Sequence, residues 1–348
     1  MPKLVALALP PGPRFVEELA AAWAAGDAVL PVDTRLPEPA QRAVVEALRV
    51  GEPVEAGDAL VVATSGTTGA PKGVVLTHEA VAASAEVTSR RLGVDPATDV
   101  WLAILPVAHV GGLSVVTRAL ATGTPFTFDE ADAATLTSVV PTQADRLDLS
   151  RFRKVLVGGS ADWRDRPSNV VSTYGLTETG SGVVYDGVPL DGVDVRVDGA
   201  TGEISIRGPM LLRAYRDGTD PKDANGWFRT GDGGHLDDDG RLVAHGRLAD
   251  VVVTGGEKVW PTPVEDALRT HPSVGDVAVA GLPDDEWGQR VVAWVVPAPE
   301  HVLDLGVLRE HVKQVLPAFA APRELIVVEQ LPRTPSGKVL RKELPRNR

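Results

Sequence analysis

One run of ten residues, Thr64 to Gly73, has the composition of a loop that can hold a polyphosphate. It reads Thr64-Ser65-Gly66-Thr67-Thr68-Gly69-Ala70-Pro71-Lys72-Gly73. Glycine lets the backbone approach a ligand and turn its N–H groups inward, hydroxyl groups add hydrogen-bond donors, and a lysine offsets negative charge. The run therefore predicts a phosphate site, whereas a solvated turn between a strand and a helix is the simpler alternative.

The run does not match the P-loop of nucleotide kinases, GxxxxGK[ST], in which glycine directly precedes the lysine and a hydroxyl residue follows it. Here Pro71 precedes Lys72 and Gly73 follows it. Any phosphate binding by this run must therefore use another arrangement.

Three further polar residues lie near glycines and could take part in phosphate chemistry: Glu178, Asp232 and Lys338. A carboxylate suits a hard cation such as Mg²⁺, a carboxylate can also accept hydrogen bonds from hydroxyl groups, and a lysine can offset charge in a transition state. Taken singly, each has an ordinary explanation as a helix cap, a structural turn residue or a solvated surface lysine.

Hydrophobic periodicity predicts that these segments lie on an α/β framework. A buried strand, Asp58 to Thr64, runs into the glycine-rich loop, and a helix from Thr77 to Leu92 follows, an order that presents backbone N–H groups to an anion. After about Val183 the pattern changes to short strands, typical of a small antiparallel sheet or barrel. The other predicted strands are 1–10, 28–32, 100–105, 125–128, 137–140, 154–157, 193–197, 202–207, 241–245, 251–253, 274–282, 291–297 and 324–328, and the other predicted helices 15–25, 39–50, 113–120, 262–269 and 305–316.

A last α/β stretch begins near Leu248 and is long enough to be a domain. We therefore expect a large N-terminal α/β domain, residues 1–247, that contains the small β-barrel-like part and is shortened at its N-terminus. A small C-terminal α+β domain, residues 248–348, follows it.

Composition predicts a globular protein and excludes several classes of function. The chain has 348 residues, 43% of them hydrophobic, and a formal net charge of -12, which argues against a broad basic surface for nucleic acid. It has no cysteine, so any thioester that it makes must use a thiol from another molecule. No apolar stretch reaches the roughly 20 residues that span a bilayer, and we expect a cytoplasmic protein without membrane insertion.

Five segments together resemble the motifs of the adenylate-forming superfamily, which includes acyl-CoA synthetases, luciferases and peptide-synthetase adenylation domains. The first is the glycine-rich run. The others follow in the family's order and are Tyr174-Gly175-Leu176-Thr177-Glu178-Thr179 (YGxTE), Gly226-Trp227-Phe228-Arg229-Thr230-Gly231-Asp232 (GWxxTGD), Gly246-Arg247-Leu248-Ala249-Asp250 with Gly255-Gly256-Glu257 (GRxxD…GG), and Pro332-Arg333-Thr334-Pro335-Ser336-Gly337-Lys338 (the terminal lysine motif). The resemblance covers the chain from about Asp58 to its end.

The resemblance implies a two-step reaction that uses ATP, Mg²⁺ and coenzyme A. A carboxylate first attacks the α-phosphate to form an acyl-adenylate, and a thiol then attacks the mixed anhydride. Three residues are implied to be catalytic: Glu178 would hold Mg²⁺ beside the α-phosphate, Thr177 would hydrogen-bond that phosphate, and Lys338 would offset charge in the adenylation step.

The resemblance also implies a nucleotide site. Tyr174 would stack on adenine, Asp232 would bind the ribose hydroxyl groups, and Arg247 would lie near ribose and phosphate. The residues implied to bind ATP or AMP are Thr64, Ser65, Gly66, Thr67, Thr68, Gly69, Lys72, Gly159, Ser160, Ala161, Ser172, Thr173, Tyr174, Gly175, Thr177, Asp232, Arg247 and Lys338.

In the family, the C-terminal domain rotates between the two steps, which removes the lysine and brings the Gly255-Gly256 segment to the CoA channel. The resemblance places the pivot at Ala249. The family usually has aspartate or lysine at this position, so the sequence departs from the pattern at its hinge.

The segment Leu105 to Leu113 resembles the family's loop beside the acyl pocket, and we place His109 at the mouth of that pocket, with Gly159 and Ser160 also against the acyl group. A histidine satisfied within the core is the simpler alternative. Arg118, nine residues later, lies in an apolar helix-like run, where a guanidinium is costly unless it meets an anion. We expect it to bind a second carboxylate of the substrate, and a salt bridge with an internal acid is the alternative.

His-x-x-Gly followed by this arginine resembles the o-succinylbenzoate-CoA ligases of menaquinone biosynthesis, whose substrate has an aliphatic carboxylate to activate and an aromatic one to bind. The alternatives are another aryl or short-chain acid-CoA ligase, a carrier-protein-loading enzyme, or a noncatalytic nucleotide-binding homologue. The expected partners are a small-molecule carboxylate, ATP and CoA, and a homodimer is left open.

Overall fold

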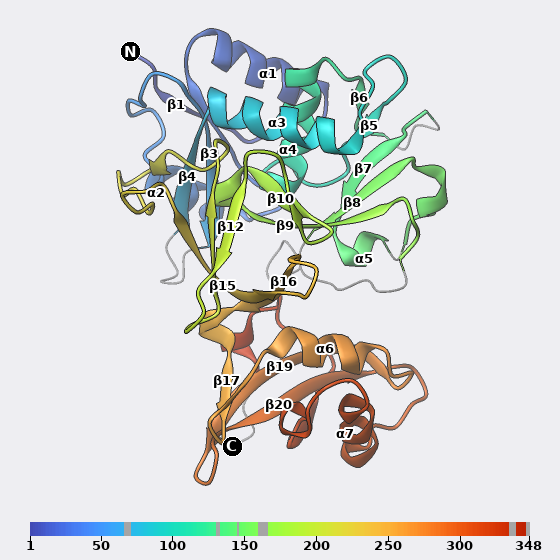
Figure 1. Ribbon diagram of the computed structural model, residues 1–348. Helices are drawn as coiled ribbons and strands as arrows, with labels where there is room; N and C mark the ends of the chain where they lie inside the picture. The colour runs from blue at the N-terminus through green and yellow to red at the C-terminus, as the bar shows by residue number, and fades with distance from the viewer. Residues whose placement is uncertain (66–70, 130–132, 145, 159–165, 334–338, 346–348) are drawn as a thin grey trace.

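The computed structural model describes residues 1–65, 71–129, 133–144, 146–158, 166–333 and 339–345, which fold into two bodies (Figure 1). Each body has its own hydrophobic core. Clusters of buried side chains in the upper body draw on residues between Leu4 and Leu242, and those in the lower body on residues between Val252 and Leu344. Burial of apolar surface therefore stabilises the two bodies separately.

The first sheet of the N-terminal body carries the glycine-rich segment. Its strand order is β1 (Leu4–Leu7), β2 (Ala28–Pro31), β3 (Asp58–Ser65), β4 (Pro71–Thr77) and β14 (Ala214–Tyr215). The strands β1, β2 and β3 are parallel, whereas β3 and β4 are antiparallel. The glycine-rich segment therefore joins two neighbouring antiparallel strands.

This topology corrects the predicted order of strand, loop and helix. The helix α3 (His78–Leu92) begins only after β4, with Thr77 as its N-cap, whose side chain accepts a hydrogen bond from Ala80 N at 3.1 Å. Val74 and Val75 are buried and pair with Val62 and Val61 of β3. These β-branched residues form a strand because β3 offers them a partner and the core covers them.

The second sheet is parallel at its centre and antiparallel at one edge. Its order is β11 (Val188–Pro189), β10 (Ser181–Tyr185), β9 (Val170–Leu176), β8 (Lys154–Gly158), β7 (Leu136–Val139), β5 (Trp101–Leu102) and β6 (Phe126–Thr127). The predicted strands near 100, 125, 137 and 154 are confirmed. Neither β9 nor β10, which flank the turn with Glu178, was predicted as a strand.

Helices α3 and α4 (Val110–Thr122) pack against each other and connect the two sheets, since α3 contacts β3, β4 and β10 and α4 contacts β5, β7 and β10. Figure 1 shows them beside α1 at the top of the upper body. The remaining helices of this body are α1 (Pro13–Ala24), α2 (Glu38–Ala47), α5 (Pro141–Ala144), and the 3-10 turns η1 (Leu149–Arg151) and η2 (Thr177–Thr179).

A third sheet confirms the small antiparallel sheet predicted after Val183. Its order is β12 (Asp194–Val197), β13 (Glu203–Arg207), β15 (Phe228–Leu236) and β16 (Leu242–Arg247). In Figure 1, β15 and β16 lie at the side of the upper body that faces the lower one.

The C-terminal body is a mixed sheet with two helices. The sheet has the order β18 (Glu257–Val259), β17 (Val252–Thr254), β20 (Gly288–Pro297) and β19 (Val274–Asp284), with β21 (Glu324–Val327) also paired to β20. Its helices are α6 (Pro261–Arg269) and α7 (Leu305–Lys313), and its 3-10 turns are η3 (Leu248–Asp250), η4 (Ala318–Ala320) and η5 (Arg341–Glu343).

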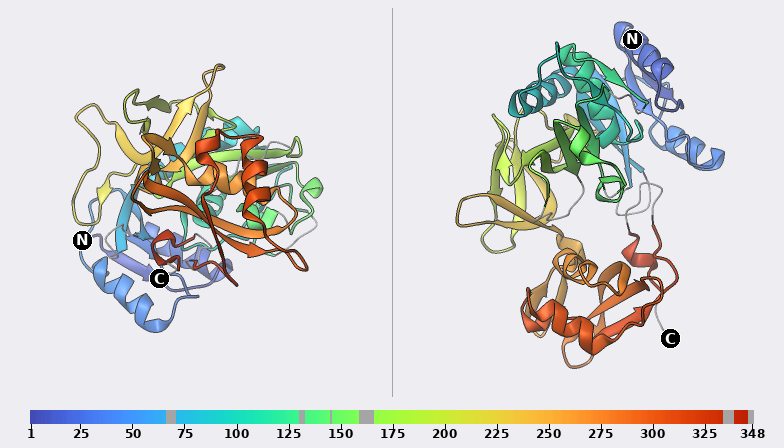
Figure 2. Two further views of the ribbon diagram at one scale, coloured as in Figure 1. Left: turned by 90° about the horizontal axis from the view of Figure 1, so that it is seen from below. Right: turned by 90° about the vertical axis from the view of Figure 1, so that its right-hand side faces the viewer.

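The two bodies meet where α6 approaches β16, and the second view of Figure 2 shows a narrow waist there. Trp260, which precedes α6, lies with its ring centroid 5.5 Å from that of His245 on β16. Within the described ranges, no helix is long and apolar enough to cross a membrane.

Candidate functional site

The Tyr174 segment forms a tight turn that holds Glu178 at the end of β9. Thr179 in this turn is buried, and its Oγ1 accepts a hydrogen bond from Leu176 N at 2.8 Å and lies 2.7 Å from Ser181 O. Gly175 has no room for a side chain, because a Cβ there would lie 2.2 Å from Ser181 O. The close approach of β9 and β10 thus fixes the backbone that carries Glu178.

Lys72 and Glu178, which belong to different motifs, are connected through Tyr215. The Lys72 Nζ lies 5.0 Å from the centroid of the Tyr215 ring, and the Tyr215 hydroxyl donates a hydrogen bond to Glu178 Oε1 at 3.0 Å. Burial raises the pKa of Tyr215 well above its usual value, and the charge of Glu178 raises it further. The hydroxyl therefore remains a donor.

Sequence reasoning missed Tyr215. It lies in none of the five motif segments, and the strand that contains it has only two residues. The one signal in the sequence that could have pointed to Tyr215 was the rarity of tyrosine, since the chain has three tyrosines in all.

Tyr174, Asp232 and Arg247 come from three motifs and form a second cluster. The strands β15 and β16 pair Asp232 with Arg247, whose Nε lies 3.0 Å from Asp232 Oδ1. The Tyr174 hydroxyl donates to Asp232 Oδ2 at 3.0 Å. Burial, with a further contribution from Asp232, raises the pKa of Tyr174. The Asp232 carboxylate is therefore held by a cation on one oxygen and by a neutral donor on the other.

The end of β8 lies beside this part of the site. In the parallel pairing of β8 with β9, Val157 is opposite Ser172 and Gly158 is opposite Thr173. The Thr173 hydroxyl donates to Val157 O at 3.3 Å, and Ser172 N donates to Asp186 Oδ1 at 2.8 Å. The predicted residues that follow, Gly159, Ser160 and Ala161, lie outside the described residues.

Only the two ends of the glycine-rich segment are described. Thr64 is near the end of β3 and Lys72 near the start of β4, and the Thr64 hydroxyl lies 3.4 Å from Lys72 O. Ser65 pairs with Pro71 at the ends of the two strands. The predicted phosphate-binding residues Gly66, Thr67, Thr68 and Gly69 lie outside the described residues.

His109 is the N-cap residue of α4 and contacts an ion pair that the sequence did not indicate. Its Nε2 lies 3.2 Å from Arg35 NH2 and 3.4 Å from Asp33 Oδ2. The pKa of Asp33 is lowered, mainly by the hydrogen bond that the Arg35 side chain donates to it. Because 74 residues separate Arg35 from His109, no local pattern could have revealed this contact.

Arg118 is buried on α4, as its apolar surroundings in the sequence predicted, and is only 1% exposed. One guanidinium nitrogen donates to Ser181 Oγ at 3.1 Å, and the guanidinium lies 5.0 Å from the Trp101 ring centroid. Its Nε and NH1 have no hydrogen-bond partner in the described structure, and no acid of the described ranges forms an ion pair with it. Burial lowers the pKa of Arg118, which reflects the cost of this uncompensated charge.

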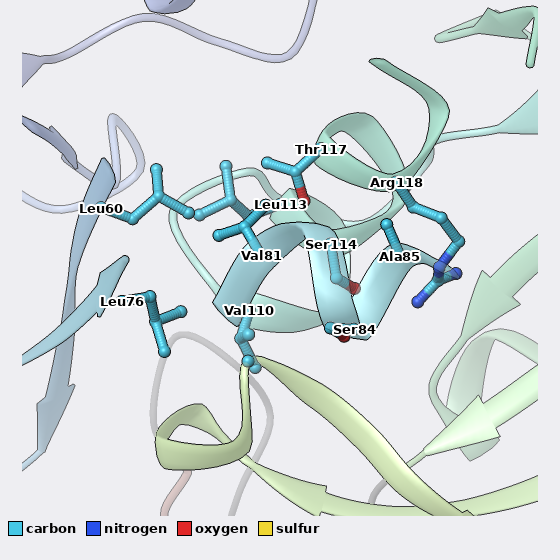
Figure 3. Close-up of a pocket in the computed structure, with 11 residues that line it drawn as sticks. Leu60, Leu76, Val81, Ser84, Ala85, Val110, Leu113, Ser114, Thr117 and Arg118 are labelled. Carbon is cyan, nitrogen blue, oxygen red and sulfur yellow. The ribbon is translucent and has the colours of Figure 1, made fainter. Parts of the chain in front are cut away.

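A small cavity lies between α3, α4 and the first sheet. Figure 3 shows Leu60 and Leu76 at one end and Arg118 at the other. Its volume is about 10 Å³, which is enough for about one water molecule.

The Gly255-Gly256 turn joins β17 to β18, and both glycines have positive φ, 59° and 84°. Gly255 N donates to Trp287 O at 2.9 Å, and a Cβ on Gly255 would lie 2.6 Å from the Trp287 ring. These contacts hold the turn within the C-terminal body.

Ala249, the predicted pivot, lies exposed in η3, between the two bodies. The predicted catalytic residue Lys338 lies outside the described residues.

The α/β topology, and the meeting of side chains from different motif segments around Glu178 and Asp232, agree with the class of nucleotide-using enzymes that the resemblance implied. Family models make the class more specific. The model of the AMP-binding enzymes matches residues 46–216, and that of the AMP-binding enzyme C-terminal domain matches residues 263–338. The chain belongs to the family of AMP-binding enzymes, which confirms the resemblance to adenylate-forming enzymes.

Two curated relatives and one solved protein illustrate the similarity. A probable 2-succinylbenzoate-CoA ligase of Mycobacterium tuberculosis is 43% identical over 86% of this chain and 87% of its own length. An indoleacetate-CoA ligase of Aromatoleum aromaticum is 35% identical over 80% of this chain and 65% of its length. The o-succinylbenzoate-CoA synthetase of Bacillus subtilis, in complex with its acyl-adenylate intermediate, has a TM-score of 0.88 at 25% identity over 99% of this chain and 88% of that one. The same enzyme has also been solved with ATP and magnesium, with a TM-score of 0.86.

Proposed function

We propose that the chain is an ATP-dependent ligase that joins o-succinylbenzoate to coenzyme A, as a step of menaquinone biosynthesis. The aliphatic carboxylate attacks the α-phosphate of ATP, pyrophosphate leaves, and an acyl-adenylate forms. The CoA sulfur then attacks the carbonyl carbon, and AMP leaves as the thioester forms. Relatives of the chain carry this activity in their names, and the Arg118 side chain is the structural observation that supports the substrate.

Glu178 fits a magnesium site that is completed by the nucleotide. The described residues hold no group of three or more His, Cys, Asp or Glu side chains that could enclose a metal. One carboxylate together with phosphate oxygens is a common environment for Mg²⁺. The bound ion supplies positive charge beside the phosphates. Glu178 would hold it, and Thr177 would donate a hydrogen bond to the α-phosphate.

The cluster around Asp232 suits the ribose of ATP. Its carboxylate is nearly buried and is already oriented by Tyr174 and Arg247, so it can accept hydrogen bonds from two hydroxyl groups without a change of side-chain conformation. Thr64 and Lys72 would bind the phosphates.

Arg118 supports a substrate with a second carboxylate. Its buried guanidinium has unpartnered N–H groups, and an anion would satisfy them and offset the cost of the buried charge. It contacts Ser181, three residues beyond Glu178, so an acid that reaches it lies near the carboxylate turn. We place His109, Gly159 and Ser160 against the rest of the acyl group.

The aromatic ring of o-succinylbenzoate cannot lie in the small cavity as it stands, because the cavity holds about one water molecule. The ring would therefore lie outside this cavity unless the residues that line it move when the acid binds. Side-chain and loop movements of this kind are common at binding sites.

We also propose that residues 1–247 and 248–348 are separate domains that rotate about Ala249 between the two steps. The separate cores of the two bodies and the exposed position of Ala249 between them support this division. Lys338 would serve the first step, and the Gly255-Gly256 turn would line the CoA channel in the second. The cytoplasmic location and the homodimer remain predictions.

The likeness to the indoleacetate ligase supports a second candidate, activation of another aryl acid. A pyrophosphate-release screen over carboxylic acids, with ATP and Mg²⁺ and with or without CoA, separates the candidates. We expect release with o-succinylbenzoate and a CoA-dependent thioester product. Equal turnover of indoleacetate or benzoate would contradict the proposed substrate, and absence of release with every acid would indicate a noncatalytic homologue.

A further inference from the structure

We propose that Tyr215 is a positioning residue for adenylate formation, whose ring orients Lys72 toward the polyphosphate and whose hydroxyl orients Glu178 toward the metal. The proposal deepens the function given above and rests on it. It adds to the site a residue that lies outside the motif segments.

Backbone pairing places the Tyr215 ring beside Lys72. The strands β14 and β4 are antiparallel, with Tyr215 opposite Val74. Arg216 N donates to Gly73 O at 2.7 Å, and Arg213 N donates to Val75 O at 2.9 Å. These hydrogen bonds on both sides of Tyr215 fix its register against β4, the strand that carries the lysine. The sheet therefore fixes the backbone from which the Tyr215 ring reaches Lys72.

The same segment holds the Glu178 turn at two points. Leu212 N donates to Glu178 O at 2.8 Å, and the Tyr215 hydroxyl donates to Glu178 Oε1 at 3.0 Å. The first hydrogen bond fixes the backbone of Glu178, and the second fixes the rotation of its carboxylate. The other carboxylate oxygen takes no hydrogen bond from the described residues, which leaves it for a cation.

Tyr215 also separates two opposite charges. No ion pair shorter than 4.0 Å joins Lys72 to Glu178 in the described structure, although both side chains contact the same tyrosine. A direct ion pair would neutralise the lysine that is proposed to bind phosphate and the carboxylate that is proposed to bind metal. The phenol gives each charge a partner of a weaker kind: the ring face attracts the cation, and the neutral hydroxyl donates to the anion. Both charges thus remain available to the metal-nucleotide complex.

Two variants separate the two halves of this role. Tyr215→Phe keeps the ring over Lys72 and removes the hydroxyl, whereas Tyr215→Leu removes both. The probes are a non-hydrolysable ATP analogue alone, followed by calorimetry, and Mn²⁺ with that analogue, followed by the electron paramagnetic resonance signal of free Mn²⁺. Neither probe contains a carboxylic acid, so the outcome does not depend on which acid the enzyme activates.

For Tyr215→Phe, we expect Mn²⁺ affinity in the ternary complex to fall about 10-fold or more, the usual effect of losing a group that orients a metal ligand. Its affinity for the metal-free analogue should remain that of the wild type. For Tyr215→Leu, the metal-free affinity should also fall about two- to fivefold, the size expected of an exposed cation–π contact.

Tyr185→Phe is the matched control, because it removes a phenol hydroxyl that contacts Thr88 Oγ1 in the core, at 3.2 Å. It should leave Mn²⁺ affinity unchanged. Wild-type Mn²⁺ affinity in Tyr215→Phe, or an equal loss in Tyr185→Phe, would overturn the role of the hydroxyl. Wild-type affinity for the metal-free analogue in Tyr215→Leu would overturn the role of the ring.

Discussion

The three tyrosines of the chain show how surroundings assign different tasks to one residue type. Tyr185 is buried in the core and shares a hydrogen bond with Thr88, whereas Tyr174 and Tyr215 each donate to a carboxylate. Burial raises the pKa of Tyr174 and of Tyr215, so both remain neutral donors at physiological pH. A neutral donor orients a carboxylate without cancelling its charge, which suits a site that must bind a metal or hydroxyl groups.

At the residue scale, Arg118→Ala should raise the KM for o-succinylbenzoate about 100-fold and leave the KM for ATP unchanged. The reason is that loss of one partner of a buried charge pair typically costs roughly 2–5 kcal/mol. Steady-state pyrophosphate release at varied acid and varied ATP measures both constants. An unchanged KM for o-succinylbenzoate would rule out the contact.

Arg118→Met tests the same idea through stability. Because the guanidinium is buried with unpartnered N–H groups, an apolar side chain of similar size should keep or raise the thermal midpoint while the acid KM rises. Arg42→Ala is the control, since that arginine is exposed on α2 and paired only with Glu38 among the described residues. It should change neither quantity.

At the scale of elements, the start of α4 depends on two neighbouring glycines that differ in their surroundings. A Cβ on Gly112 would lie 2.4 Å from Leu105 O and 2.5 Å from Pro106 O, which are backbone atoms. A Cβ on Gly111 would meet Leu105 Cδ1 at 3.3 Å, the end of a side chain that can rotate. Close packing of α4 on the loop that precedes it therefore requires the second glycine and tolerates a change at the first.

We accordingly expect Gly112→Ala to lower the free energy of unfolding by about 1–3 kcal/mol, the usual cost of overpacking. It should also raise the acid KM, because it displaces the helix that carries His109 and Arg118. Gly111→Ala should have little effect, since alanine favours the helix. Urea unfolding of both variants provides the comparison, and equal destabilisation would contradict this account.

At the scale of the whole molecule, the two bodies contact each other through Trp260. A Cβ on Gly233 would lie 2.0 Å from the Trp260 ring, so the indole rests directly on the backbone next to Asp232. Trp260 also approaches His245, whose Nε2 lies 2.8 Å from His235 Nδ1. The position of the C-terminal body is thereby linked to the strands that carry Asp232 and Arg247.

This contact predicts a dependence of stability on pH. Burial lowers the pKa of His245 below its ordinary value, and the neighbouring His235 lowers it further. As the pH falls through about 6.5, the unfolded chain takes up a proton at this residue that the folded protein does not, so stability decreases. Between pH 7.5 and 5.5, the thermal midpoint of the wild type should therefore fall more than that of His245→Gln. Parallel decreases would contradict the assignment.

The proposed rotation predicts that the two half-reactions respond differently to Lys338→Ala. Adenylate formation should fall about 100-fold or more, as for loss of a group that stabilises charge in a transition state. Supplied acyl-adenylate and CoA should still give the thioester at nearly the wild-type rate. Separate assays of pyrophosphate release and of thioester formation check this, and equal losses in both would contradict the rotation.

Sequence reasoning was accurate for segments whose signal is local. Apolar periodicity located α1, α3, α6 and α7. The roles proposed for Lys72, Glu178, Asp232 and Arg247 stay predictions, although the structure brings Tyr174, Asp232 and Arg247, from three motif segments, together. Sequence reasoning was wrong about the segment after the glycine-rich loop, where β4 precedes α3. A strand of this kind depends on its partner β3, and a run of apolar residues alone does not reveal that partner.

The sequence by itself thus determined the class of chemistry, because the motif segments that indicate it are short contiguous runs. Only the tertiary structure decided which groups meet. Tyr215 reaches Glu178 across 37 residues, Tyr174 reaches Asp232 across 58, and Arg118 reaches Ser181 across 63. Such contacts follow from the register of strands and the packing of helices, which are set by the whole core and not by any local pattern.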